Sequence, residues 1–342
     1  MVKKANTSYV LYVIKEIAFS LFATLKILNL IKNLRRKDRR IILHAFDTVY
    51  GGLAAAVASK LTGVPLISQT HGLRTKFIRT ITSNRFLIIL DYLIEKFVIN
   101  QSKFLISVNK EALIFWECRG IQKYKLKLLR VPVDLEVFKP NVKLRKYMRV
   151  KFGLNKKTFV IGYVGRLSPE KNVEILLRAF NKARQKESLL SSKLFIVGDG
   201  LQRDRLKNLS ISLSLSKDVI FTGFRRDIPL LLNGMDVLVL PSLIEGNPTV
   251  VLEAMASGVP VVCSNIPAHR EIISHMRNGM LFSVNDVNEL ACILSLLYRN
   301  KKLLERLRKA GRTYVKSKNN INKIINALKK LYFEAVSNPN SY

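Results

Sequence analysis

LPSLIEGNPTVVLEAMASGVPVV, residues 240–262, decides the fold class of this chain. Its apolar start followed by Gly246 and Pro248 predicts the end of a strand and a turn. A helix is predicted to begin near Thr249 and to end at Gly258, before the second apolar strand VPVV. This order is half of a parallel α/β unit. The start of the helix would offer unpaired backbone N–H groups and a positive dipole end to an anionic or hydroxyl-rich ligand.

Two glutamates stand eight positions apart in this stretch, Glu245 on the turn and Glu253 inside the helix. Glu245 would lie in front of the helix start, where its carboxylate accepts hydrogen bonds from sugar hydroxyls. Glu253 would reach back toward the same crevice from the next helical turn. The competing interpretation is a surface glutamate and a helix-capping glutamate, because two glutamates at this spacing often occur by chance.

The stretch resembles the E-x7-E signature of retaining glycosyltransferase family 4, whose members have the two-domain GT-B fold and use nucleotide-sugar donors. The family's other landmarks follow in sequence order at VPLISQTHG (64–72), RVPVDLEVFKP (130–140), VGRLSPEKNVEILLRAF (164–180), FIVGDGLQRDRL (195–206) and VIFTGF (219–224). The resemblance implies two Rossmann-like parallel-sheet domains that face a central cleft. Residues 1–145 would form the acceptor-side domain and residues 146–316 the donor-binding domain. Residues 317–342 would form a helix that crosses back to the first domain.

The resemblance implies a diphosphate clamp made by Arg166 and Lys171. Breaking a sugar–phosphate bond leaves a diphosphate whose growing charge two fixed cations can stabilise without a metal. The alternative is a solvated basic face, which is ordinary in a chain with 58 Lys and Arg residues. The resemblance also brings His71 near the transferred sugar, although a lone histidine is more often structural, and Arg74 is a weaker candidate for an acceptor phosphate.

The resemblance assigns the remaining site roles to one group of residues. Glu245 would act with the clamp on the donor sugar, and Glu253 would bind the nucleotide ribose. The residues implied in donor binding are Gly165, Phe224, Gly246, Asn247, Pro248, Thr249 and Glu253. Family members often carry Phe where Asn247 stands, so we expect a different donor preference here. The GDG triplet at 198–200 lacks the third glycine of a dinucleotide fingerprint, and we interpret it as a tight turn that lines the nucleotide pocket.

Composition points to an anionic partner. The chain has 58 Lys and Arg against 24 Asp and Glu, which gives a net charge of +34. Phospholipid headgroups, pyrophosphate-linked lipids and nucleic acid all fit this charge, but no recognised nucleic-acid motif is present, so we expect no nucleic acid. The chain contains no D-x-D triplet and no metal-spaced His/Cys/Asp cluster. We therefore expect no metal and no other cofactor.

Residues 8–31 form the most membrane-like segment, but Lys15, Glu16 and Lys26 interrupt it. The pattern predicts an amphipathic helix that ends in the basic run KNLRRKDRR (32–40). Packing on its own domain is the favoured interpretation, and lying on an anionic membrane surface is the alternative. Three widely spaced cysteines fit a reducing cytosol. We expect a cytoplasmic protein that is peripheral at the membrane face.

Continuous apolar runs predict two series of strands separated by a basic connector at 141–151. The first series lies at 41–46, 65–70, 104–108 and 127–131, and the second at 159–165, 193–199, 219–224, 236–242 and 259–264. Family members open with a strand and a Gly-rich turn, whereas here the first 40 residues contain no glycine. The first domain is therefore expected to be truncated, with YVLYVI (9–14) as a substitute strand.

These patterns predict a retaining, metal-independent transfer from a UDP- or GDP-sugar to a lipid-linked or polysaccharide acceptor. The alternative is a non-catalytic nucleotide-sugar-binding subunit, or one that needs a complementing polypeptide for its first domain. Because the predicted clamp lies wholly in the second domain, we expect that domain to bind nucleoside diphosphate. We expect slow turnover unless the first domain is completed.

Overall fold

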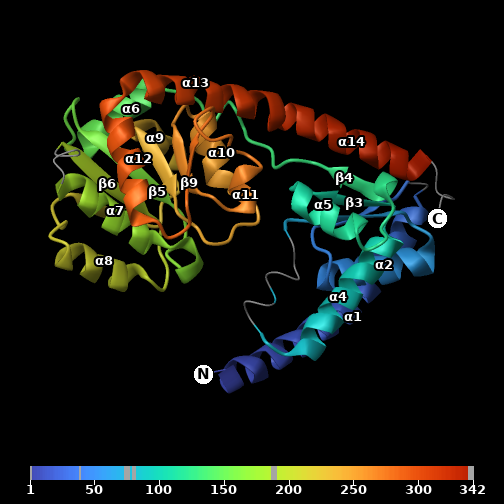
Figure 1. Ribbon diagram of the computed structural model, residues 1–342. Helices are drawn as coiled ribbons and strands as arrows, with labels where there is room; N and C mark the ends of the chain where they lie inside the picture. The colour runs from blue at the N-terminus through green and yellow to red at the C-terminus, as the bar shows by residue number, and fades with distance from the viewer. Residues whose placement is uncertain (1, 38–39, 73–77, 79–81, 186–190, 338–342) are drawn as a thin grey trace. The chain divides into compact units, whose positions relative to one another are not determined.

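The computed structural model describes residues 2–37, 40–72, 78, 82–185 and 191–337 (Figure 1). The chain divides into two compact units, residues 1–130 with 322–342 and residues 131–321. The predicted boundary after residue 145 lies inside the second unit. The reason is that helix α6 (Val142–Lys151) packs against α9 (Ile228–Gly234) of that unit.

The first unit contains a four-stranded parallel sheet in the order β1-β2-β3-β4. Its strands are β1 (Leu43–Ala45), β2 (Leu66–Thr70), β3 (Phe104–Ser107) and β4 (Leu126–Leu128). The helices around it are α1 (Val2–Arg35), α2 (Tyr50–Thr62), α4 (Arg85–Gln101), α5 (Lys110–Glu117) and α14 (Ile321–Ser337). A 3-10 turn at Lys123–Lys125 precedes β4. The four predicted strands are confirmed, each somewhat shorter than its apolar run.

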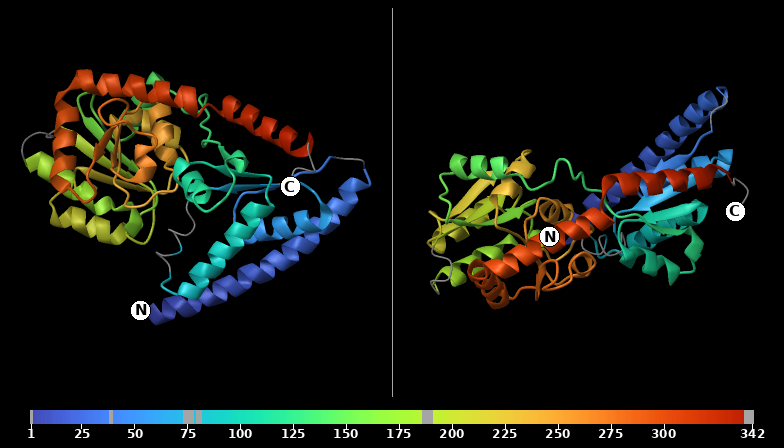
Figure 2. Two further views of the ribbon diagram at one scale, coloured as in Figure 1. Left: turned by 45° about the vertical axis from the view of Figure 1, so that its right-hand side comes forward. Right: turned by 90° about the horizontal axis from the view of Figure 1, so that it is seen from above.

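Helix α1 lies along α2 and α4 (Figure 2). Its buried positions Val13, Ser20, Thr24 and Ile31 recur at helical spacing, and Ser20 Oγ donates a 2.8 Å hydrogen bond to the carbonyl of Tyr50. The predicted strand at 9–14 is wrong, because these residues lie within α1, whose burial at intervals of four and seven residues is the pattern of a helix. The predicted packing of this helix on its own domain is confirmed. In the described part of the chain, no helix is long and apolar enough to cross a membrane.

The second unit has a six-stranded parallel sheet in the order β10-β9-β8-β5-β6-β7, with helices on both sides (Figure 1). Its strands are β5 (Phe159–Val164), β6 (Ser192–Val197), β7 (Val219–Gly223), β8 (Val237–Leu240), β9 (Val261–Ser264) and β10 (Met280–Phe282). Its further helices are α7 (Val173–Gln185), α8 (Arg203–Ser212), α10 (Thr249–Ala256), α11 (Pro267–Arg270), α12 (Val287–Arg299) and α13 (Lys301–Lys318). Five of these strands were predicted, and β10 was missed.

The basic connector predicted at 141–151 is a helix, α6. Met148 and Arg149 are buried on the face that meets α9. Arg149 donates to the carbonyl of Gly234 at 3.2 Å and pairs with Asp236 at 3.4 Å. A Cβ on Gly234 would lie 2.1 Å from Met148 Sδ, so a larger residue would force the Met148 side chain or the helix to shift. The prediction failed because the basic pattern hides a buried face that needs these distant partners.

Candidate functional site

The second sheet reverses its strand order between β5 and β8. Open parallel α/β sheets bind ligands beyond the carboxyl ends of their strands at such a reversal. The loop after β5 carries Gly165, Arg166 and Lys171, and the loop after β8 carries Glu245. The topology therefore brings four of the predicted site residues to one crevice of the sheet.

An ion pair joins the two loops. Lys171 Nζ lies 2.7 Å from Glu245 Oε1, and the two side chains are only 16% and 8% exposed. Ser242 Oγ donates to the same carboxylate oxygen at 2.7 Å. The N–H of Leu243 donates to the carbonyl of Glu170 at 2.8 Å. These bonds hold the lysine and the glutamate in fixed positions before any ligand arrives.

A buried chain of hydrogen bonds supports this pair from below. Ser264 Oγ donates to the carbonyl of Ser242, and His269 Nδ1 lies 2.7 Å from the carbonyl of Ser264. His269 is fully buried, and burial lowers the pKa of its imidazole, which keeps it neutral. The sequence analysis gave His269 no role. Its only sequence signal is its position shortly after the carboxyl end of β9.

Arg166 is held loosely. Its side chain is 79% exposed, and its Nη2 lies 3.6 Å from Glu170 Oε1. Its carbonyl accepts a 2.7 Å hydrogen bond from the buried Tyr163 hydroxyl, so the backbone is fixed while the guanidinium remains free. Burial acts to raise the pKa of Glu170, but the Ser168 hydrogen bond and the nearby cations lower it on balance. An anionic ligand can therefore engage Arg166 without breaking a strong contact.

The GDG triplet packs against the Gly165–Leu167 loop. Gly198 has φ 133°, and a Cβ there would lie 1.9 Å from the Gly165 carbonyl oxygen. Gly200 has φ 152°, and its Cβ would lie 2.6 Å from the Leu167 carbonyl oxygen. The predicted tight strand-to-helix turn is confirmed. The two glycines allow their backbone to pack directly against the backbone of residues 165–167, and this contact fixes the loop that carries Arg166.

The start of α10 lies at the surface. Its N-cap is Pro248, no side chain of the described residues caps the helix, and Gly246 and Thr249 are exposed. Asn247 Oδ1 is buried without a hydrogen-bond partner in the described part of the chain. Glu253 is half-buried on α10, and burial raises the pKa of its carboxyl. Phe224 follows β7 and is 72% exposed, which leaves its ring available for stacking.

His71 belongs to the first unit, directly after β2, and its ring is exposed. Its Nε2 lies 3.4 Å from Gln69 Nε2. Behind it, His44 Nδ1 lies 2.6 Å from the Tyr332 hydroxyl, and burial, opposed by a hydrogen bond with Gln69, lowers the pKa of His44. The sequence analysis missed His44 and Tyr332, which are far apart in the chain. Arg74 lies outside the described residues.

Metal-binding geometry is not found in the described residues. No group of three or more His, Cys, Asp or Glu side chains is placed to hold a metal ion there. The site therefore offers two cations, two carboxylates and the start of α10. The charged groups are Arg166, Lys171, Glu245 and Glu253.

Comparisons with known proteins gave matches to one family and to several relatives. Residues 145–314 match the family described as glycosyl transferases group 1. The chain is 30% identical over 324 residues, 93% of its length, to the UDP-Gal:alpha-D-GlcNAc-diphosphoundecaprenol alpha-1,3-galactosyltransferase of Escherichia coli, covering 82% of that protein. It is 30% identical over 277 residues to the putative glycosyltransferase EpsD of Bacillus subtilis, covering 79% of this chain and 71% of EpsD. The crystal structure of Anabaena HepE with UDP and glucose superposes with a TM-score of 0.76 at 20% identity, over 91% of this chain and 81% of HepE.

Proposed function

The chain belongs to the glycosyl transferases group 1, and on this premise we propose that it moves a sugar from a UDP-sugar to a lipid-linked glycan acceptor with retention of configuration. It is a glycosyltransferase, and its two parallel-sheet α/β units are those of the GT-B fold. The UDP donor is favoured over GDP by the E. coli relative named for UDP-Gal and by the UDP bound to HepE.

The observation that carries the proposal is the Lys171–Glu245 pair at the switch point, beside the uncapped start of α10. Lysine has three donors, so Lys171 can keep Glu245 and also bind a diphosphate oxygen. Arg166 supplies the second cation from its exposed position. The dipole of α10 adds further positive potential.

The proposed reaction needs only these groups and the two substrates. The bond between the anomeric carbon and the diphosphate oxygen breaks while the acceptor hydroxyl forms its bond on the same face of the sugar. The acceptor proton passes to the leaving phosphate oxygen. Arg166 and Lys171 stabilise the charge that develops on the diphosphate, which is where electrostatic catalysis has its largest effect. Glu245 orients the sugar hydroxyls, and Glu253 binds the ribose.

The proposal includes a peripheral place at the membrane, where a lipid-linked acceptor is found. Helix α1 exposes an apolar stripe with lysines beside it. The stripe, called here the α1 stripe, consists of Ile14, Leu21, Phe22 and Leu25. Apolar side chains flanked by cations are the pattern of helices that lie in the interface of an anionic bilayer.

The test is UDP release from purified protein supplied with UDP-sugars and a diphosphoundecaprenol-linked sugar. Glu245→Ala and Arg166→Ala are each expected to lower turnover by at least about a hundredfold, as expected when a transition-state charge contact is lost. Arg178→Ala is the matched control, because Arg178 is also an exposed arginine with a glutamate partner four residues away. Wild-type turnover in the Glu245 and Arg166 variants would disprove the site assignment.

Transfer is also expected to persist in excess chelator. The two cations and the helix start supply the charge that a divalent ion supplies in enzymes with a metal-bound diphosphate. The measurement compares initial rates with and without chelator, and then with added Mg²⁺ or Mn²⁺. A rate that chelator abolishes and a metal restores would contradict this part of the proposal.

A second candidate is a nucleotide-sugar-binding subunit that needs a complementing polypeptide for transfer. It is favoured by the strand order of the first sheet, which runs β1-β2-β3-β4 without a reversal among the described strands. A switch-point crevice is then offered by the second sheet alone. UDP binding without sugar transfer, and transfer restored by a partner fraction, would favour this candidate over the first.

A further inference from the structure

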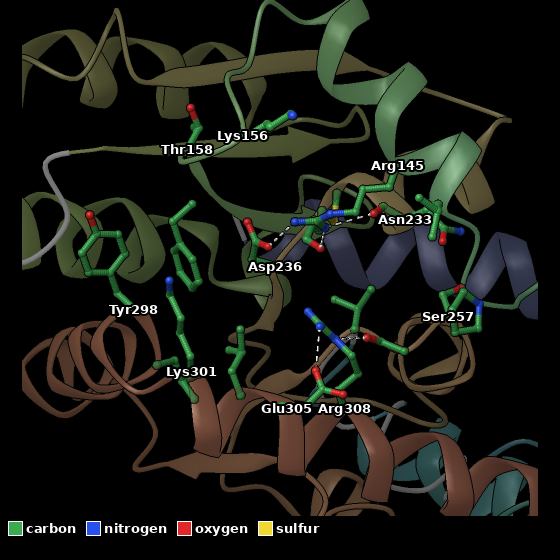
Figure 3. A pocket seen from close by; sticks show the side chains of 18 of the residues that line it. Arg145, Lys156, Thr158, Asn233, Asp236, Ser257, Tyr298, Lys301, Glu305 and Arg308 are labelled. Carbon is green, nitrogen blue, oxygen red and sulfur yellow. Dashed lines mark hydrogen bonds and ion pairs between the residues drawn. The ribbon is translucent and has the colours of Figure 1, made fainter.

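A large cavity opens at the opposite end of the second sheet from the candidate donor site. It has a volume of 940 Å³ and lies wholly within the second unit (Figure 3). Phe159, Asp236 and Val259 line it at or just before the starts of β5, β8 and β9. The donor-site loops follow the carboxyl ends of these strands, so the cavity is a separate feature.

The cavity carries surplus positive charge. Its basic side chains are Arg145, Lys156, Lys157, Lys301 and Arg308, and its acidic ones are Asp236 and Glu305. Both carboxylates are already neutralised. Asp236 pairs with Arg145 at 2.6 Å and with the buried Arg149 beneath it, and Glu305 pairs with Arg308 at 3.0 Å.

Three lysines remain for a ligand. In the described part of the chain, no hydrogen bond or ion pair engages the side chain of Lys156, Lys157 or Lys301. Figure 3 shows Arg145 and Arg308 reaching the hollow from opposite sides, with Lys301 toward Tyr298 and Ser257 at the other end. Cations from three separate segments thus line one hollow, and their charges add to a positive potential that attracts an anion.

A buried hydroxyl in the cavity wall also lacks a partner. Ser257 is 4% exposed, lines the cavity, and its Oγ has no hydrogen-bond partner among the described residues. Leaving such a group unpaired costs about 1–3 kcal/mol, so buried hydroxyls are nearly always satisfied by protein, by ordered water or, at a binding site, by the ligand. The neighbouring carbonyl of Gly258 already accepts from Arg308 Nε at 2.9 Å and so does not repel an anion.

We propose that this cavity binds a small organic phosphate as a second ligand site, distinct from the donor site. Lys301 would bind a phosphate group beside Tyr298, and the Ser257 hydroxyl would donate to an oxygen at the other end of the ligand. Phe159, Leu297 and Tyr298 provide an apolar wall for the organic part. The volume exceeds that of inorganic phosphate and fits a phosphorylated sugar or nucleotide within the usual range of ligand pockets.

The test is calorimetric titration of inorganic tripolyphosphate into the full-length chain. Arg166→Ala serves as the background so that donor-site binding does not mask the second site. Lys301→Glu is expected to weaken binding by at least about tenfold, a change of 1.4 kcal/mol. Lys302→Glu is the matched control, because Lys302 is the next residue on α13, is also exposed and does not line the cavity.

Ser257→Ala provides the second variant. It is expected to weaken binding several-fold without lowering the melting temperature, because it removes a hydroxyl that has no partner in the free protein. Equal losses in Lys301→Glu and Lys302→Glu would overturn the proposal in favour of diffuse attraction by a chain of charge +34. Tripolyphosphate binding that vanishes in Arg166→Ala alone would also overturn it, because the probe would then occupy only the donor site. Neither result depends on sugar transfer.

Discussion

Lys171 and Glu245 are separated by 74 residues in the chain and yet form a 2.7 Å ion pair. A largely buried pair of this kind stabilises little by itself, because desolvation offsets most of the attraction. Its effect is to hold each group where a ligand will meet it. Ser242 adds a hydrogen bond to the carboxylate, so rotation of Glu245 is restricted. The pair therefore pre-organises the site, and the energy of donor binding need not order it.

Glu253→Gln is expected to stabilise the free protein and to weaken UDP binding. Burial raises the pKa of Glu253, so the folded protein holds this proton more tightly than the unfolded chain does. The charged form is thus destabilising, and the penalty grows as pH rises from the unfolded pKa of about 4.3 through the folded pKa. The variant should be more stable than wild type in urea at pH 7.5, and this advantage should vanish near pH 4.

The same variant should bind UDP about tenfold or more weakly, because a carboxylate accepts hydrogen bonds from ribose hydroxyls more strongly than an amide does. Glu136→Gln, at an exposed glutamate outside the site, is the control. Unchanged UDP affinity in Glu253→Gln would remove the ribose role from Glu253.

At the scale of elements, the contact between α6 and α9 depends on one glycine. Gly234 ends α9, and Met148 of α6 packs directly on it. Arg145 and Arg149 then reach Asp236 at the start of β8, whose Oδ2 also accepts from the N–H of Val160 at 2.8 Å. The helix, the sheet and the floor of the cavity are thereby joined through a single carboxylate.

Gly234→Ala is expected to destabilise the protein by about 1–3 kcal/mol through overpacking. The added methyl would lie 2.1 Å from Met148 Sδ, so either the helix or the side chain must move. Urea unfolding at neutral pH measures the change. In a Met148→Ala background, Gly234→Ala should lower the free energy of unfolding by less, because the Met148 side chain that meets the added methyl is absent. An equal loss of unfolding free energy in both backgrounds would show that Met148 does not limit how closely α6 packs on α9.

At the scale of the whole molecule, the net charge of +34 is spread over both units, while the α1 stripe belongs to the first. Charge brings a protein to an anionic surface, and apolar side chains determine which face inserts. The described helices include none that could span a bilayer. The net charge and the α1 stripe are the basis of the peripheral attachment proposed above.

Binding to vesicles with anionic lipid is expected to be strong at low salt and to be lost at high salt. Leu25→Asp, in the α1 stripe, should weaken it by about tenfold, because an exposed leucine would no longer enter the interface. Val150→Asp is the control, since Val150 is an exposed apolar residue of the second unit. Binding that only detergent reverses would contradict peripheral attachment, and equal effects of the two substitutions would exclude insertion through α1.

The sequence by itself determined the parallel α/β class and most strands, because buried parallel strands are continuous apolar runs that neighbours in the chain reveal. Local patterns and motif order also led to Arg166, Lys171, Glu245 and the start of α10. Only the tertiary structure decided that residues 141–151 form a helix with a buried face. Arg149 on that face can be buried because it pairs with Asp236, which is distant in the chain. The chain from His269 through Ser264 and Ser242 to Glu245, and the cavity around Ser257, were likewise beyond prediction. Hydrogen-bond partners and cavities are set by which distant segments the fold brings together, and that information is absent from any local stretch of sequence.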